Sequence, residues 1–215
     1  MVRTLPESSN LITDVWIKKS WDEFLALAEQ SEYEQARFYY DNGLIRIETM
    51  PIDSGHSRDN TLLSQVVSLY GTLKNIRIVG FTNGSFRKAG ERECQPDLAF
   101  YVGADFRIPP KSSEPIDINE FGAPAIAIEI ASTTINDDLG RKRLLYERLG
   151  IQEYWAVDVN AAEVIAFEVF DGGSRQIQES QVLPGLKITT VEETLKRSQT
   201  EDNGAINRWL LQAFM

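Results

Sequence analysis

The most restrictive feature of this chain is a nearly unbroken apolar run at residues 125–131, AIAIEIA, whose single charged residue is Glu129. A strand with apolar side chains on both faces is typical of the centre of a sheet that is covered on both sides. The run therefore predicts a central strand under packed helices. Because an unpaired buried carboxylate is costly, Glu129 is expected near the end of this strand, where its side chain can leave the apolar layer.

A second acid has a similar setting. Asp97 lies in QPDLAF at residues 95–100, again within an apolar, strand-like segment. Desolvating such a carboxylate costs several kcal/mol unless it is paired, hydrogen-bonded or bound to a cation. A divalent metal shared by Asp97 and Glu129 would account for both acids. The structural alternative for Asp97 is a carboxylate that caps the turn after Pro96 through local backbone hydrogen bonds.

Hydrophobic periodicity and turn residues predict the remaining elements. SWDE at residues 20–23 has the form of a capping box, and Asn42-Gly43 favours a tight hairpin. Helices are expected at residues 21–30, 57–73, 138–149, 191–197 and 205–214. Strands are expected at residues 36–40, 44–50, 76–81, 85–88, 97–102, 125–131, 153–159 and 163–170, with a surface excursion at 103–121. This order predicts an α/β fold of the α+β type, with helices packed on one largely antiparallel sheet.

Composition limits the class of protein. With 215 residues, 42% of them hydrophobic, the chain can bury one full core, and we expect a single domain at 1–215 with its core at about 20–190 and terminal helices beyond. No apolar segment approaches the roughly 18 residues that span a bilayer, and the first residues lack a signal-peptide core, so we expect a cytoplasmic protein with no membrane partner. Cys94 is the sole cysteine, which excludes an intrachain disulfide.

The net charge of −10 disfavours nucleic-acid binding unless the chain carries a local basic surface. Metal-assisted cleavage of a phosphodiester needs acidic oxygens for a hard cation and a positive group near the water or the phosphate. Lys142, on the helix after the Glu129 strand, is the candidate positive group, and it shares a helical face with Asp138 and Tyr146. The alternative is that residues 141–143 form a solvated basic turn.

Other residues offer supporting roles, each with an alternative. His56 precedes a helix and could cap it, lie on the surface, or assist near the metal or substrate. Glu48 and Asp53 flank one loop, and either could add a carboxylate to the site. Ser132 follows the central strand, where it could hydrogen-bond a site carboxylate or begin a turn.

These motifs form an ordered series along most of the chain: RFYY at 37–40, HSRDN at 56–60, PD at 96–97, IEIAS at 128–132, Asp138-x3-Lys142-x3-Tyr146, GIQEYWAVD at 150–158 and VLPGL at 182–186. The series resembles the Uma family of bacterial proteins assigned as endonucleases. That family belongs to the PD-(D/E)xK restriction-endonuclease-like superfamily, so the resemblance implies a restriction-endonuclease-like core.

The resemblance also implies a DNA endonuclease that depends on Mg²⁺ or Mn²⁺. Asp97 and Glu129 would bind the metal, and His56, Ser132 and Asp138 would support them. The superfamily's usual lysine, two positions after the glutamate, is replaced here by Ala131, and the resemblance suggests Lys142 as its substitute.

Enzymes that cut both strands of a duplex often pair two sites by two-fold symmetry, so a homodimer is expected. The alternatives are a catalytically inactive binding or assembly protein of the same fold, and a hydrolase of another phosphoester.

Overall fold

The computed structural model describes residues 13–49, 54–171 and 173–215, and these residues contain two six-stranded sheets. The first sheet has the order β1 (Ile17–Lys18), β3 (Leu44–Thr49), β2 (Ala36–Asp41), β6 (Arg92–Cys94), β5 (Phe86–Lys88), β8 (Ile116–Asp117). The second has the order β12 (Gly173–Ile177), β11 (Glu163–Phe170), β10 (Glu153–Asp158), β9 (Ile126–Ala131), β7 (Leu98–Val102), β4 (Ile78–Thr82). Among the described strand pairs, β9 with β10 and β5 with β8 are parallel, and the others are antiparallel.

The mixture of helices with largely antiparallel strands is confirmed, but the prediction of one sheet is wrong. The chain leaves the first sheet after β6 and enters the second at β7 through Gln95, Pro96 and Asp97. Pro96 has no backbone N–H to donate to a ladder, so the pairing of β6 does not continue through this residue. The chain also passes between the two sheets on either side of β4 and of β8. Sequence periodicity reports which segments are strands but not which strand each one pairs with.

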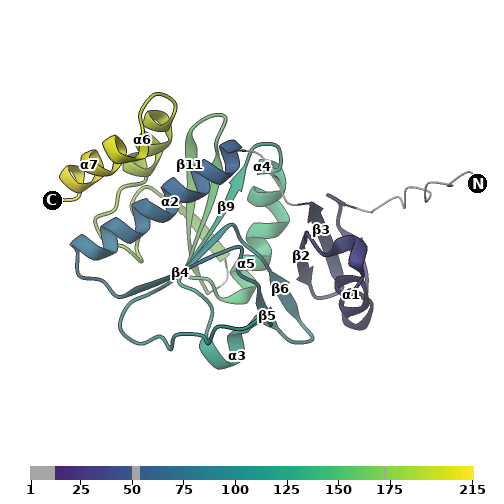
Figure 1. The fold of residues 1–215 in the computed structure, drawn as a ribbon. Coiled ribbons are helices and arrows are strands. Elements are labelled where there is room, and N and C mark those ends of the chain that lie inside the picture. Colours follow the sequence, from purple (N-terminus) through teal and green to yellow (C-terminus); the bar gives the residue numbers. More distant parts are fainter. Residues whose placement is uncertain (1–12, 50–53, 172) are drawn as a thin grey trace, which may run out of the picture.

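The helices cover the second sheet unequally (Figure 1). Helices α2, α6 and α7 contribute to the core on one face of this sheet, and α5 lies on its other face with the first sheet. The helical segments are α1 (Trp21–Ala28), η1 (Ser31–Tyr33), α2 (Ser54–Leu73), α3 (Ile118–Phe121), α4 (Ile135–Asp137), η2 (Asp138–Lys142), α5 (Arg143–Leu149), α6 (Ile188–Ser198) and α7 (Asn203–Ala213). Among the described residues, no helix is both long enough and apolar enough to cross a membrane.

The central strand β9 explains the apolar run. Successive side chains of a strand point to opposite faces. Ile126, Ile128 and Ile130 enter the core beneath α2, whereas Ala127 and Glu129 face the layer of α5 and the first sheet. The small alanine leaves room beside the acid. Glu129 lies near the carboxyl end of β9, as predicted, and is only 2% exposed.

The hairpin of β2 and β3 also has two distinct faces. One face carries Phe38, Tyr40, Ile45 and Ile47, which form a separate core with Phe24 of α1. The opposite face carries the aromatic Tyr39 together with the polar residues Arg37, Arg46 and Glu48 toward the second sheet. The predicted capping box of α1 is confirmed, because the Ser20 side chain accepts from the Glu23 backbone and Glu23 accepts from Ser20 N.

Several short elements depart from the sequence prediction. Strands β1, β6 and β12 were not predicted, and the segment at 103–121 contains β8 and α3 as well as irregular chain. Strands of two or three residues are too short to display alternation, and β12 is a mostly polar edge strand. The helix predicted at 138–149 begins instead as α4 and a π-helical segment, η2.

Candidate functional site

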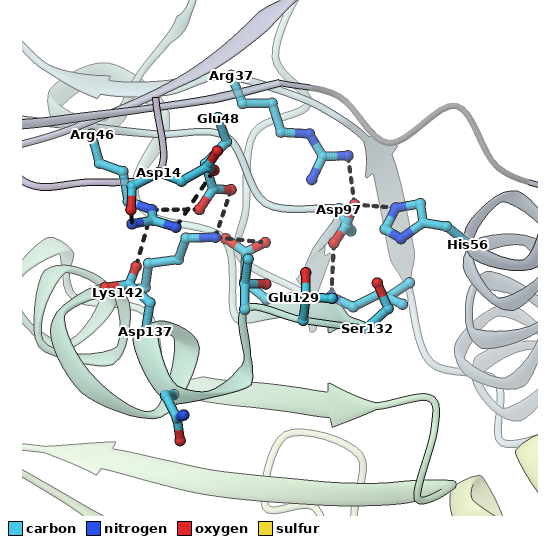
Figure 2. Close-up of a pocket in the computed structure, with 14 residues that line it drawn as sticks. Asp14, Arg37, Arg46, Glu48, His56, Asp97, Glu129, Ser132, Asp137 and Lys142 are labelled. Carbon is cyan, nitrogen blue, oxygen red and sulfur yellow. Dashed lines mark hydrogen bonds and ion pairs between the residues drawn. The ribbon is translucent and has the colours of Figure 1, made fainter. Parts of the chain in front are cut away.

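Strand register brings the two predicted acids together. In the antiparallel pair of β7 and β9, Leu98 lies opposite Ile128. One further step along this register places Asp97, directly before β7, across from Glu129. Residues paired in this way point to the same face, with Cβ atoms about 5 Å apart. Both side chains line one pocket (Figure 2).

Asp97 is fully engaged by positive and polar partners. Its Oδ1 lies 2.5 Å from the Arg37 guanidinium and 2.9 Å from His56 Nε2, and its Oδ2 accepts from the backbone N–H of Ile130 at 2.7 Å. Burial alone would raise the pKa of Asp97, but the hydrogen bond with His56 and the charge of Arg37 lower it below its usual value. Asp97 is therefore held as a carboxylate. Of the alternatives for His56, the structure places its ring beside a site carboxylate.

Glu129 has weaker compensation. The Tyr146 hydroxyl donates to Glu129 Oε1 at 2.5 Å, and the Lys142 ammonium lies 3.8 Å from Oε2. Burial raises the pKa of Glu129 to about 8 against the opposing charge of Lys142, and Asp97 is among the nearby carboxylates that add to the rise. Glu129 is thus a buried acid whose negative charge is poorly balanced by its surroundings.

Lys142 is not part of a solvated turn, so that alternative is wrong. Its side chain is buried, and its Nζ lies 2.8 Å from Glu48 Oε2 and 3.0 Å from Asp138 Oδ1, over the ring of Tyr39. Burial alone would lower the pKa of the ammonium, but the carboxylates of Glu129, Asp138 and Glu48 raise it above its usual range. Lys142 is therefore a permanent cation within a cluster of acids.

The hairpin supplies three site residues. Arg37 lies opposite Glu48 across the β2–β3 ladder, and Arg46 Nε lies 2.6 Å from Glu48 Oε1 and 3.3 Å from Asp137 Oδ2. Glu48 is thus one of the two acids between which the sequence left the choice open; the other, Asp53, lies outside the described residues. Sequence reasoning gave no role to Arg37 or Arg46, although a two-residue turn at Asn42-Gly43 already implies the register that aligns Arg37 with Glu48.

A π-helical segment positions the lysine. Helix η2 (Asp138–Lys142) interrupts the helix after β9, and Gly140 within it has non-helical dihedral angles of φ −99° and ψ −107°. Such π-segments recur at functional sites, because the extra residue redirects the side chains that follow. The predicted face of Asp138, Lys142 and Tyr146 is retained across it, since Lys142 contacts Asp138, and both Lys142 and Tyr146 lie beside Glu129.

The pocket has a volume of about 530 Å³ and an excess of acids. Ser132 lies exposed at its rim, where its carbonyl accepts from Asn160 Nδ2. The lining holds three obligate cations and five acids, so with His56 neutral it carries two excess negative charges when every acid is ionised. The cations are Arg37, Arg46 and Lys142, and the acids are Asp14, Glu48, Asp97, Glu129 and Asp137.

The donor set suits one kind of metal better than another. Within residues 13–49, 54–171 and 173–215, no three His, Cys, Asp or Glu side chains are grouped so that they could hold an ion. Two carboxylates nevertheless line the same pocket, and Mg²⁺ commonly binds through one or two carboxylates while keeping several waters. The residues present therefore fit a partly hydrated hard cation and do not fit a closed protein cage.

Comparison with known proteins agrees with this fold. The crystal structure of a protein described as a putative nuclease belonging to DUF820, from Anabaena variabilis, superposes with a TM-score of 0.56 at 22% sequence identity. The match covers 82% of this chain and 99% of that one, and at this identity it supports the fold alone. No curated protein matches the chain. The model of the Uma2 family, described as "Putative restriction endonuclease", matches residues 21–210. The chain therefore belongs to the Uma2 family.

Proposed function

We propose that this protein is a DNA endonuclease that depends on Mg²⁺ or Mn²⁺, with Asp97 and Glu129 as the metal-binding carboxylates. The observation that carries the proposal is the placement of these two acids across one register in a pocket with excess negative charge. The raised pKa of Glu129, about 8, indicates how poorly its buried charge is balanced by the protein. A divalent cation would relieve that imbalance.

The chain's own residues would then have distinct roles. A bound divalent cation supplies Lewis-acid polarisation and a more acidic water. Arg37 and His56 keep Asp97 ionised and fix its orientation from two elements, β2 and α2. The Lys142 ammonium, 3.8 Å from Glu129, would orient the attacking water or offset charge that develops on the phosphate. Asp138 supports Lys142 from the same helix.

The charge balance of the pocket also argues for metal dependence. The lining carries one excess negative charge while Glu129 is neutral below its pKa of about 8, and two once Glu129 ionises. It repels a phosphate diester, because its cations already contact acids of the same pocket. A bound divalent cation would cancel that excess. We therefore expect the metal to be required for productive binding of DNA as well as for cleavage, and we expect two copies of the chain to act together on a duplex.

Cleavage assays test this proposal. Supercoiled, linear and single-stranded DNA would be incubated with the wild type, Asp97→Ala, Glu129→Ala and Lys142→Ala, in Mg²⁺, Mn²⁺ or EDTA. Glu93→Gln serves as the matched control, because Glu93 is a buried strand glutamate that pairs with Arg87 outside the pocket. We expect cutting with Mg²⁺ or Mn²⁺ in the wild type and the control only. Cutting that persists in EDTA, or in folded Asp97→Ala and Glu129→Ala variants, would refute the proposal.

One observation favours a second candidate, a non-catalytic binding or assembly protein. Lys142 makes its close contacts with Glu48 and Asp138, and Ala131 stands at the superfamily's usual lysine position. A lysine held in this way could be purely structural. Metal binding that needs Asp97 and Glu129, without cleavage of any of the three DNA forms, would support this candidate.

A further inference from the structure

Lys142 lies unequally between three carboxylates. Its Nζ is 2.8 Å from Glu48 and 3.0 Å from Asp138, but 3.8 Å from Glu129. Figure 2 shows Lys142 between Glu48 and Glu129. The buried Glu129 carboxylate accepts from the Tyr146 hydroxyl on Oε1, and a free ammonium beside Oε2 would move into direct contact with it. Some other group must therefore hold Lys142 away from Glu129.

Glu48 is the group placed to do this. Asp138 precedes Lys142 by one helical turn, so its contact moves with the helix that carries the lysine. Glu48 comes from β3 of the first sheet and is itself anchored, since Arg46 Nε lies 2.6 Å from its other carboxylate oxygen. Arg46 in turn contacts Asp137 and the backbone carbonyl of Asp14. The ammonium is thus drawn toward the hairpin by a fixed partner.

We propose that Glu48 is a positioning residue that holds the Lys142 ammonium off Glu129 and so leaves the Glu129 carboxylate available to a divalent cation. This inference rests on the proposed metal site and assigns Glu48 no contact with the metal. Lys142 and the cation compete for the same carboxylate, and Glu48 decides the competition. Arg46 acts through Glu48 in the same direction.

The size of the effect follows from the distances. If Glu48 were lost, Lys142 could approach Glu129 from 3.8 Å to the 2.8 Å that it now keeps from Glu48. At an effective dielectric constant of about 20, this stronger attraction corresponds to about a tenfold weaker affinity for a competing cation. The change is large enough to measure by titration.

The test is calorimetric titration of the full chain with MnCl₂. We expect Glu48→Gln to weaken Mn²⁺ binding about tenfold, because Lys142 then attracts Glu129 more strongly at the shorter distance. Glu48→Asp should weaken binding less, because the carboxylate is kept. The double variant Glu48→Gln/Lys142→Met removes one acid and one cation, so the pocket keeps its net charge. In the double variant no ammonium remains to occupy Glu129. The affinity of the double variant for Mn²⁺ should therefore return to within about threefold of the wild-type affinity.

Asp137→Asn separates positioning from simple charge. Asp137 lines the same pocket and contacts Arg46 and Trp16, with no ion pair to Lys142, and asparagine keeps an acceptor for the Trp16 indole. We expect this variant to weaken Mn²⁺ binding by less than about threefold, since it removes charge without releasing the lysine. An effect equal to that of Glu48→Gln would overturn the proposal. A double variant as weak as Glu48→Gln would also overturn it, because Glu48 would then be a ligand itself.

A crystal structure of metal-free Glu48→Gln decides the inference even if the wild type binds no Mn²⁺. The absence of binding would remove the metal site from the proposed function, but it would not bear on where Lys142 rests. We expect Lys142 Nζ within about 3 Å of Glu129 Oε2, at normal ion-pair distance. An ammonium that stays 3.8 Å away without Glu48 would overturn the positioning role.

Discussion

Two buried glutamates on neighbouring strands of the second sheet meet opposite surroundings. Glu153 opens β10 and accepts hydrogen bonds from four neutral donors: Trp155 Nε1, Ser180 Oγ, and the backbone N–H groups of Gln181 and Val182. Glu129 in β9 has one hydroxyl donor, from Tyr146, and an ammonium 3.8 Å away. Burial raises the pKa of both acids.

The difference shows that a carboxylate in an apolar strand does not by itself mark a functional site. Glu153 fastens the segment at 180–183 to the sheet, and its hydrogen-bonding capacity is used within the protein. Glu129 lines a pocket with other acids, and part of the hydrogen-bonding capacity of its carboxylate is not used within the protein. Of these two glutamates, Glu153 is satisfied by donors within the protein, whereas Glu129 is left to be satisfied by a ligand.

The largest expected effect is a loss of stability when Glu153, the glutamate satisfied by donors within the protein, is replaced. Glu153→Ala leaves four donors without their acceptor, and it should lower the free energy of unfolding by about 3 kcal/mol or more. Urea denaturation at pH 7 measures this loss. A change below about 1 kcal/mol would mean that water replaces the carboxylate and that the two glutamates differ less than their contacts suggest.

Replacing Glu129 is expected to raise the free energy of unfolding, in contrast to replacing Glu153. Folding raises its pKa from 4.5 to about 8, so its favourable contribution is complete below pH 4.5 and is lost as the pH rises toward 8. The glutamine in Glu129→Gln cannot ionise. At pH 8 in metal-free buffer, the free energy of unfolding of this variant should therefore be about 1 to 3 kcal/mol higher than that of wild type, so the variant is more stable. Urea denaturation from pH 4.5 to 8 should show this advantage growing with pH. An advantage that is constant with pH would contradict the assignment of the raised pKa.

The smallest expected effect on stability comes from removing one of the four hydrogen-bond donors to Glu153. Ser180 Oγ donates to Glu153 at 3.1 Å and accepts from the backbone N–H of Leu183. Ser180→Ala should lower the free energy of unfolding by about 1 kcal/mol and leave metal binding unchanged. Thermal denaturation and MnCl₂ titration of the same sample check both parts. A change in metal affinity would indicate that the two glutamates are coupled through the sheet.

Sequence reasoning found the acids because a charge within an apolar strand is conspicuous in one dimension. Asp97 and Glu129 stand out in this way, and helical spacing pointed to Asp138 and Lys142. Sequence reasoning could not tell that Glu129 and Glu153 have different roles. Three of the donors that satisfy Glu153 come from residues 180–182, which are distant in sequence. The second sheet was missed for a similar reason, since pairing partners are set by tertiary packing.

Arg37 and Arg46 show a different limit. A charged residue in a hairpin strand is typical of a solvated face, and only the docking of the hairpin against the second sheet makes both side chains buried. The tight hairpin predicted at Asn42-Gly43 is confirmed, and its two-residue turn sets the register of both arginines. What the sequence could not supply was the identity of the surface that this face of the hairpin covers.

The most direct test of the account is the shift in Tm caused by MnCl₂ at pH 7.5, measured for wild type, Glu129→Gln and Glu153→Gln. A ligand that binds only the folded state raises Tm in proportion to its binding free energy. We predict a rise for wild type and for Glu153→Gln, despite the lower starting Tm of the latter, and no rise for Glu129→Gln. An equal rise in all three proteins, or a rise lost only in Glu153→Gln, would contradict the claim that Glu129 is the acid left for a cation.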